Sequence, residues 1–327
     1  MTSLHKAGLH GAALHGAQLH TDWRQIPDQA RGAILALGNF DGVHLGHAHL
    51  LRTLHAARPD APLGVLTFEP HPRELFRPED PPFRLTLSDE RHAALAALGV
   101  AHVFEIRFDR EFSEFSAERF VGEVLHRSLG ALHLACGADF AYGHRRGGDV
   151  STLAIQAEAL GIGLTVVPAL ADAGGPFSSS RIRRALLDGY PERATEELGR
   201  PWSVRGVVRH GDKRGRLLGF PTANISLGRH LEPARGVYAV SVRLPDGATC
   251  PGVANIGRRP TVNDTTESRL EVHLLEFEGD LYDQELLVSL HTLLRAERKF
   301  DGLDALKAQI TLDADWARDY LRRLTPT

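Results

Sequence analysis

The stretch from residue 37 to residue 47 constrains the local fold more tightly than any other part of the chain. An apolar run, residues 33–37, ends abruptly in Gly38, and a helix-like stretch begins near His47. Glycine allows the backbone angles of a tight turn and the close approach of a ligand. A helix that begins there directs unpaired N–H groups and the positive end of its dipole at the turn. The pattern predicts strand, turn and helix, which together form a phosphate site.

Further apolar segments follow at regular intervals, with helix-like stretches between them. We predict strands at residues 33–37, 63–68, 102–106, 132–136 and 164–167, and helices at residues 88–98, 116–129 and 151–160, several of them opened by a capping serine. Short apolar strands that alternate with helices predict an α/β domain with a mostly parallel, Rossmann-like sheet and helices on both faces. Ligands of such sheets bind beyond the carboxyl ends of the strands.

Residues with phosphate-binding chemistry follow these strands. The candidates are Gly38, Asn39, Phe40, Asp41, Gly42, His44 and His47 after the first strand, His71 between two prolines after the second, Asp139 after the fourth, and Ser179, Ser180, Arg181 and Arg183 after the fifth. Serines at a helix start bind phosphate, and arginines add charge. Taken alone, each segment is equally an ordinary loop with exposed histidines or a capping serine. Their common position at one sheet edge favours a nucleotide site.

The pattern changes after residue 202. Short alternating segments at residues 203–209, 237–244, 250–256, 269–277 and 286–293 follow one another, some separated by turns, and predict a small antiparallel β-barrel. Residues 300–324 predict a C-terminal amphipathic helix or pair of helices, with Leu303, Leu306, Ile310, Trp316 and Tyr320 in the core. The predicted organisation is an extension over residues 1–20, an α/β domain over 21–188, a linker or short helix over 189–200, and a barrel domain over 201–327.

The barrel region carries a second set of candidate residues. Its glycine-rich, basic segment offers backbone N–H groups and charge to phosphates through Gly211, Lys213, Gly215, Arg216, Gly219, Phe220 and Pro221. Thr222 and Asn224 are oxygen donors two residues apart, a pattern that suits Mg²⁺. The segment lacks the Walker A pattern. Glu271 lies on the second face of an alternating strand, where it is a candidate proton acceptor, although an exposed glutamate is the better interpretation from the strand alone.

Both sets of motifs resemble those of the bacterial bifunctional riboflavin kinase/FMN adenylyltransferase family, the FAD synthetases. The first set is G-N-F-D-G-V-H-x-G-H, T-F-E-P-H-P and S-S-S-R-I-R; the second is G-F-P-T-A-N, G-V-A-N-I-G-R-R-P-T and E-V-H-L. Together they span roughly residues 24–315. Ser180 replaces a threonine of the family pattern but keeps the hydroxyl, and Tyr142 replaces a phenylalanine but keeps the ring.

The resemblance implies two reactions. Riboflavin is phosphorylated by ATP in the barrel domain, with Glu271 as base, Thr222 and Asn224 on Mg²⁺ and nucleotide, and Asn255 in substrate binding. FMN is then adenylylated in the α/β domain to give FAD and pyrophosphate, with His44, His47 and Arg181 stabilising charge. The alternatives are a single-activity enzyme with one decayed module, a flavin-binding regulator, and an adenylyltransferase of another substrate such as pantetheine phosphate or nicotinate mononucleotide.

Composition excludes several classes of partner. The formal net charge is −3, and no block of lysine and arginine indicates a nucleic-acid surface. No apolar run approaches a membrane span, and no secretory segment is present at the start. Cys136 and Cys250 are interpreted as small buried hydrophobes in a reducing compartment. We therefore expect a cytoplasmic enzyme of small molecules, monomeric or weakly homo-oligomeric.

Residues 1–20 stand apart from the rest. Leu-His recurs every five residues, at His5, His10, His15 and His20, a period that fits neither a helix nor a strand. We interpret the segment as a flexible extension or a misassigned start. Its histidines have no fixed geometry with which to select a metal.

Overall fold

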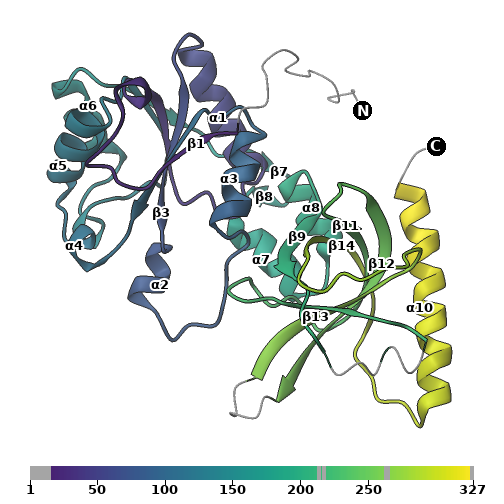
Figure 1. Ribbon diagram of the computed structural model, residues 1–327. Coiled ribbons are helices and arrows are strands. Elements are labelled where there is room, and N and C mark those ends of the chain that lie inside the picture. The colour runs from purple at the N-terminus through teal and green to yellow at the C-terminus, as the bar shows by residue number, and fades with distance from the viewer. Residues whose placement is uncertain (1–15, 212–214, 216–218, 261–265, 325–327) are drawn as a thin grey trace.

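The protein has two parts, a parallel α/β sheet domain and an antiparallel barrel, joined by two short helices (Figure 1). The computed structural model describes residues 16–211, 215, 219–260 and 266–324. The first sheet has the order β1-β4-β3-β2-β5-β6 and is parallel throughout. Its strands are β1 (Gln18–His20), β2 (Ile34–Leu37), β3 (Leu63–Glu69), β4 (His102–Arg107), β5 (His133–Gly137) and β6 (Gly163–Val167). The predicted parallel sheet is confirmed.

Helices cover both faces of this sheet, as expected. The helices of this domain are η1 (Asp28–Ala30), α1 (Leu45–Ala57), α2 (Pro72–Phe76), α3 (Ser88–Ala96), α4 (Arg110–Ser113), α5 (Ala117–Arg119), the π-helix η2 (Phe120–Ser128), η3 (His144–Arg146) and α6 (Val150–Ala159). One face packs Leu54 of α1 and Leu95 of α3. The other packs Val124 of η2 and Leu153 of α6. Burial on both faces explains why the strands are continuous apolar runs.

Two details of this domain differ from the sequence prediction. Ser116 caps α5 as expected, but α3 begins after Leu87 and α6 is capped by Asp149 instead of by Ser151. Strand β1 lies inside the segment predicted to be a flexible extension. It pairs in parallel with the edge strand β4, and the His20 ring stacks on Phe104 with centroids 4.9 Å apart. Unpaired backbone groups at the edge of β4 give this short segment its partner.

The second sheet is an antiparallel barrel that nearly closes. Its order is β10-β13-β12-β11-β14-β9, and a bridge between Arg209 and Asn224 brings the two outer strands together. The strands are β9 (Trp202–Val207), β10 (Ala223–Ser226), β11 (Gly236–Arg243), β12 (Thr249–Pro260), β13 (Thr266–Leu274) and β14 (Glu285–Ala296). The predicted barrel is confirmed, and β10 is an additional strand that contains part of the predicted metal-binding segment.

The segment between the domains is helical and packs against the barrel. After the small hairpin β7 (Ala171–Asp172) and β8 (Gly175–Pro176) come α7 (Ser179–Leu187) and α8 (Pro191–Leu198). Ile182, Leu186 and Leu198 are buried in the same core as the barrel residues. Leu85, from the loop before α3, also lies in this core. The two domains are therefore connected by shared packing.

A single helix, α10 (Leu303–Leu324), lies against the outside of the barrel. Its buried residues are Asp313, Ala314 and Ala317, which pack near Ala239. The prediction for Leu303 and Trp316 was wrong, because they are 68% and 55% exposed. Small alanines let the helix approach the sheet, and Trp316 points away from that contact face. Leu306, Ile310 and Tyr320 are partly buried.

We predict that Asp313→Ala loosens α10. Asp313 is buried and accepts hydrogen bonds from Arg295 at 2.8 and 3.0 Å, and its loss leaves that guanidinium without its carboxylate. The free energy of unfolding should fall by about 2–3 kcal/mol. Urea unfolding followed by tryptophan fluorescence measures this. The matched control is Asp315→Ala on the exposed face, which should change stability by less than about 0.5 kcal/mol. Equal effects of both variants would contradict the proposed anchor.

Candidate active sites

The larger cavity lies beyond the carboxyl ends of the parallel strands and has a volume of about 740 Å³. It collects residues from loops that are far apart in the sequence, as the topology of such sheets requires. The predicted residues that line it are Gly38, Asn39, Phe40, Asp41, His44, His47, His71, Asp139, Ser179, Ser180 and Arg183. The sequence pattern therefore identified a set of residues that meet in this cavity, although not its whole lining.

His44 and His47 are stacked at the start of α1, with ring centroids 3.7 Å apart and planes 22° apart. His44 is the N-cap residue, and its Nδ1 accepts a hydrogen bond from the backbone N–H of His47 at 3.4 Å. The Nδ1 of His47 accepts in turn from the N–H of His44 at 3.3 Å. This reciprocal capping occupies both Nδ1 atoms, which leaves Nε2 as the second nitrogen of each ring, and both residues line the cavity.

Burial favours the neutral form of these imidazoles. It lowers the pKa of His44 to about 4, against a partial opposing effect of Asp41, and it lowers the pKa of His47 well below the ordinary value. Since each Nδ1 accepts a backbone hydrogen bond, the proton of each neutral ring lies on Nε2. In the free enzyme the pair therefore presents two N–H donors, and these suit phosphate oxygens without a full positive charge.

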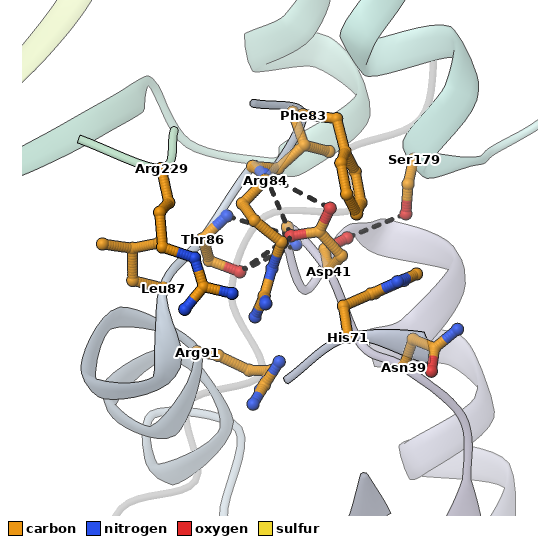
Figure 2. A network of polar contacts seen from close by, with 12 residues as sticks. Asn39, Asp41, His71, Phe83, Arg84, Thr86, Leu87, Arg91, Ser179 and Arg229 are labelled. Carbon is orange, nitrogen blue, oxygen red and sulfur yellow. Dashed lines mark hydrogen bonds and ion pairs between the residues drawn. The ribbon is translucent and has the colours of Figure 1, made fainter. Parts of the chain in front are cut away.

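Asp41 lines the cavity, but its carboxylate is bound by groups of the protein itself (Figure 2). It accepts hydrogen bonds from the backbone N–H groups of Leu85 at 2.9 Å and Thr86 at 3.0 Å, and from Arg183 Nη2 at 2.6 Å. The Ser179 hydroxyl donates to the Asp41 carbonyl oxygen at 2.8 Å. The sequence favours a direct role for Asp41 in binding nucleotide. The geometry instead gives the carboxylate the role of joining three loops that surround the cavity.

Two predicted residues lie outside the lining of this cavity. The Arg181 guanidinium pairs with Asp172 at 3.0 Å and with Glu197 at 2.5 Å, so the expected action of Arg181 on substrate does not match its position. Residues two apart on a helix point in nearly opposite directions, and Arg183 is the one that faces the cavity. Gly42 serves the turn itself, with φ = 86° and its N–H on the Thr86 hydroxyl at 3.0 Å.

Sequence reasoning missed two groups of lining residues. Arg145 and Arg146 lie in the loop after β5 with positive φ angles of 52° and 59°, and both are exposed toward the cavity. Among the described residues, no carboxylate pairs with either of them. Aromatic rings form a second part of the wall and include Phe68, Phe76, Phe83, Phe108 and Phe112. The run of phenylalanines after the third predicted strand, at Phe108 and Phe112, was the signal available in the sequence.

The second pocket lies on the barrel and is smaller, about 90 Å³. Of the predicted residues, Gly211, Pro221, Thr222 and Asn224 line it. Gly211 passes so close to Asn224 that a β-carbon there would lie 2.4 Å from Asn224 Nδ2. A side chain at position 211 would therefore displace the Asn224 amide.

Glu271 and Asn255 lie beside this pocket instead of in its lining. In the strand register, Asn224 of β10 is opposite Glu271 of β13, and Glu271 is opposite Asn255 of β12. Directly opposite residues of antiparallel strands share a face, with β-carbons about 5 Å apart. Leu270 and Val272 point into the barrel core, so this polar row faces outward. The predicted metal donor and the predicted base are thus neighbours.

The remaining predicted residues of this segment are not in the pocket lining or lie outside the described residues. Gly215 O accepts a hydrogen bond from the Phe220 N–H at 2.8 Å, and Gly219 has φ = 88°. Phe220 contacts the His273 ring, with centroids 5.4 Å apart. Lys213 and Arg216 lie outside the described residues.

Two phosphate-directed sites on two folds define a nucleotide-dependent transferase with two centres. A family model for FAD synthetase matches residues 26–181, and one for riboflavin kinase matches residues 198–321. The bifunctional riboflavin kinase/FMN adenylyltransferase of Escherichia coli (strain K12) is 41% identical over 297 residues, which cover 90% of this chain and 95% of that protein. The enzyme of the same name from Pseudomonas fluorescens is 44% identical, over 88% of this chain and 93% of that protein. The one from Bacillus subtilis (strain 168) is 34% identical, over 91% of this chain and 96% of that protein. The chain belongs to the bifunctional riboflavin kinase/FMN adenylyltransferase family.

A solved structure shares the whole fold. The crystal structure titled as a macrolide-efflux protein from Streptococcus pneumoniae matches with a TM-score of 0.82 and 31% identity, covering 92% of this chain and 98% of that one. Its title names efflux, whereas both family models and the curated relatives name flavin enzymes. Within the residues that the structure describes, no helix is long and apolar enough to cross a membrane. The likeness therefore supports the fold, and the flavin families indicate the function.

We predict that the depressed pKa of His44 makes stability pH-dependent. The unfolded imidazole takes up a proton below about pH 6.5, whereas the folded one does so only near its pKa of about 4. The His44 contribution is therefore complete above pH 6.5 and is lost as the pH falls toward 4. His44→Asn keeps an N-cap acceptor but does not titrate. Urea titrations measure the free energy of unfolding at each pH. Between pH 6.5 and pH 4 the parent protein should lose on the order of 2 kcal/mol more of this free energy than His44→Asn does. Parallel curves would contradict the assignment.

Proposed function

We propose that the cavity at the parallel sheet is the FMN adenylyltransferase site and the barrel pocket the riboflavin kinase site. The chain performs two successive steps of FAD biosynthesis: phosphorylation of riboflavin by ATP to give FMN, and adenylylation of FMN by ATP to give FAD and pyrophosphate. The observation that carries the assignment of sites is the position of each pocket within its own matched family region.

The polar row on the barrel supports the kinase step. The 5′-hydroxyl of riboflavin attacks the γ-phosphorus of ATP, the bond from that phosphorus to the β,γ-bridging oxygen breaks, and ADP leaves. Glu271 takes the hydroxyl proton. Asn224 and Asn255 flank Glu271 on the same face and orient the reacting groups. Catalysis of this kind depends mainly on positioning and on charge neutralisation.

Asn224 supports a magnesium site beside that base. Its side chain is 7% exposed, and its Oδ1 has no hydrogen-bond partner among the described residues. A buried carbonyl oxygen without a donor is costly unless a cation or water meets it. No group of three or more histidine, cysteine or acidic residues suited to a metal occurs within the described ranges. Thr222 and Asn224 would hold Mg²⁺, which favours a few protein oxygens, phosphates and waters and neutralises phosphate charge when bound.

The neutral histidine pair supports the adenylyl step. The FMN phosphate is already anionic, so its oxygen attacks the α-phosphorus of ATP without a general base, and pyrophosphate leaves. His44 and His47 donate Nε2–H groups to the charge that develops, and the N–H groups at the start of α1 and α7 add to them. Arg145 and Arg146 supply positive charge to the pyrophosphate.

The aromatic wall supports a flavin in the same cavity. Phe68, Phe108 and Phe112 form edge and tilted ring contacts between 5.4 and 6.0 Å and leave a large apolar surface. Such a surface suits the planar flavin ring. An adenylyltransferase of pantetheine phosphate would have no use for this wall.

The family comparison also weighs against the competing functions. Both modules match their family models, which disfavours a single-activity enzyme with a decayed module. A flavin-binding regulator would not need a carboxylate beside candidate magnesium ligands. Cys136 and Cys250 are free thiols, which supports the proposal of a reducing, cytoplasmic setting. We retain a monomer or weak homo-oligomer as the proposed state.

We predict that the two activities can be lost separately. Glu271→Gln should lower the rate of FMN formation from riboflavin by about 10²–10⁴-fold because no base remains, and FAD formation from supplied FMN should continue. His47→Ala should lower FAD formation by about 10²–10³-fold because a donor to the transition state is lost, while riboflavin phosphorylation continues. Separation of flavins by chromatography measures both.

Matched controls use the same elements. Glu276→Gln, after β13, and His55→Ala, in the last turn of α1, replace exposed residues outside both sites and should leave both rates unchanged. Wild-type FMN formation by Glu271→Gln would refute the base. Unimpaired FAD formation by His47→Ala would refute the first site.

We predict that Asn224→Ala weakens the response to magnesium. Loss of one oxygen donor should raise the Mg²⁺ concentration for half-maximal riboflavin phosphorylation by about tenfold or more, which corresponds to about 1.4 kcal/mol. The measurement is FMN formation across a magnesium titration. The magnesium response of FAD formation from FMN in the same variant is the internal control and should not move. An unchanged midpoint for the kinase would exclude Asn224 as a ligand.

A further inference from the structure

Arg200 joins the end of α8 to the start of β9 and reaches back to the adenylyltransferase loop. Its Nη2 donates to the Gly42 carbonyl at 2.8 Å, and its Nη1 donates to the Val43 carbonyl at 3.1 Å. Arg200 is partly buried, and within the described residues no carboxylate lies within ion-pair distance of its guanidinium. Burial lowers the pKa of Arg200, and the negative charge of Glu90 opposes this effect in part. A partly buried guanidinium that donates to backbone carbonyls instead of to a carboxylate fixes the position of those carbonyls.

The loop that Arg200 binds is strained. Phe40 and Val43 have φ angles of 50° and 45°, although neither is glycine, and Gly42 between them has φ = 86°. Non-glycine residues persist in this region only where their surroundings hold them, and β-branched residues such as valine adopt it least readily. The carbonyls of Gly42 and Val43 immediately precede His44, the N-cap of α1. Any relaxation of the loop would therefore move the histidine pair.

A second contact from the same segment holds the neighbouring loop. Trp202, at the start of β9, donates its indole N–H to the Leu85 carbonyl at 2.9 Å. The N–H of Leu85 in turn donates to Asp41 at 2.9 Å. Leu85 itself is buried in the core that contains Trp202. The first residues of the barrel domain thus hold both loops that meet at Asp41.

We propose that Arg200 is a positioning residue for adenylyl transfer, which makes this site dependent on the segment that begins the kinase domain. The fork of the guanidinium binds the carbonyls of Gly42 and Val43 together, and so keeps His44 and His47 in line with the substrate phosphates. The inference rests on the proposed assignment of the larger cavity to adenylyl transfer.

The electrostatic effect of Arg200 agrees with this geometry. Its positive charge adds to burial in lowering the pKa of both His44 and His47. For His44, Arg183 acts in the same sense and Asp41 in the opposite one. Arg200 therefore favours the neutral donor form of the pair as well as its position.

The dependence runs in one direction. Arg200 is not among the residues that line the barrel pocket, and its hydrogen bonds to the described residues go to Gly42, Val43 and Leu198. Loss of its side chain should therefore reach the adenylyl site and spare the kinase site.

The test compares Arg200→Gln, Arg200→Lys and the control Arg184→Gln in the full chain. Arg184, on α7, makes an exposed ion pair with Asp188, and within the described residues it forms no hydrogen bond or ion pair with residues 40–43. Arg200→Gln should lower kcat for FAD formation by about tenfold or more, with the KM for FMN nearly unchanged because the aromatic wall is intact. Arg200→Lys, which can bind one carbonyl at a time, should recover part of that loss. Arg184→Gln should leave both activities at the wild-type level.

Each outcome decides the matter. Wild-type FAD formation by Arg200→Gln would overturn the inference, and the proposed function would stand if His47→Ala abolished FAD formation in parallel. If His47→Ala also had no effect, the assignment of the cavity itself would fail. Equal loss of both activities in Arg200→Gln, or a rise in the KM for FMN without a fall in kcat, would show a merely structural role. If Arg200→Gln does not fold, the same split measured on Arg200→Lys decides between these outcomes.

Discussion

The structure of the adenylyl site depends on the buried carboxylate of Asp41. A side chain that is 2% exposed carries a charge that two backbone N–H groups and the Arg183 guanidinium satisfy. These donors come from the loop before α3 and from α7, so one anion joins three segments around the cavity. Removing a buried charge from such a set, or one of its partners, leaves the others unpaired. The site is thereby organised before any substrate binds, which is what charge stabilisation in a transition state requires.

A second set of buried charged groups forms ion pairs at the junction of the two domains. Arg84, which is fully buried, contacts Glu69 at 2.9 Å and Glu74 at 3.1 Å, and Arg229 from the barrel side lies 3.8 Å from Glu69. Figure 2 shows Arg84 and Arg229. Nearby in the same junction, the His230 ring contacts the Glu90 carboxylate at 2.7 Å. Ion pairs of this kind add little net stability but fix one arrangement. The domains are therefore held in register by polar contacts as well as by shared packing.

Sequence reasoning predicted five of the six parallel strands to within one residue, because buried strands leave continuous apolar runs. It missed β1 and β10, three and four residues long, which are held by edge pairing that local pattern does not encode. Most of the residues that it predicted for this domain line the cavity, since the carboxyl ends of parallel strands share one edge. The prediction differs from the structure where the direction of a side chain on a helix, or a partner distant in the chain, determines its contacts. Arg183 lines the cavity in place of Arg181, and the Asp41 carboxylate binds other loops of the protein. Trp316 is exposed instead of buried in the core. The Arg200 contact joins segments distant in the chain, which no local motif encodes, and the aromatic wall left only the signal of Phe108 and Phe112 in the sequence.

Fusion of two enzymes in one chain therefore has a structural consequence beyond the shared intermediate. FMN is the product of one site and the substrate of the other, yet the described lining residues of the two pockets have no member in common. The junction does not lengthen either cavity; it holds the strained loop before His44. A contact that fixes loop geometry needs only short, well-aligned hydrogen bonds, whereas a channel would need a continuous polar path. The physical link between the two activities in this chain is thus that the domain junction positions the loop before His44.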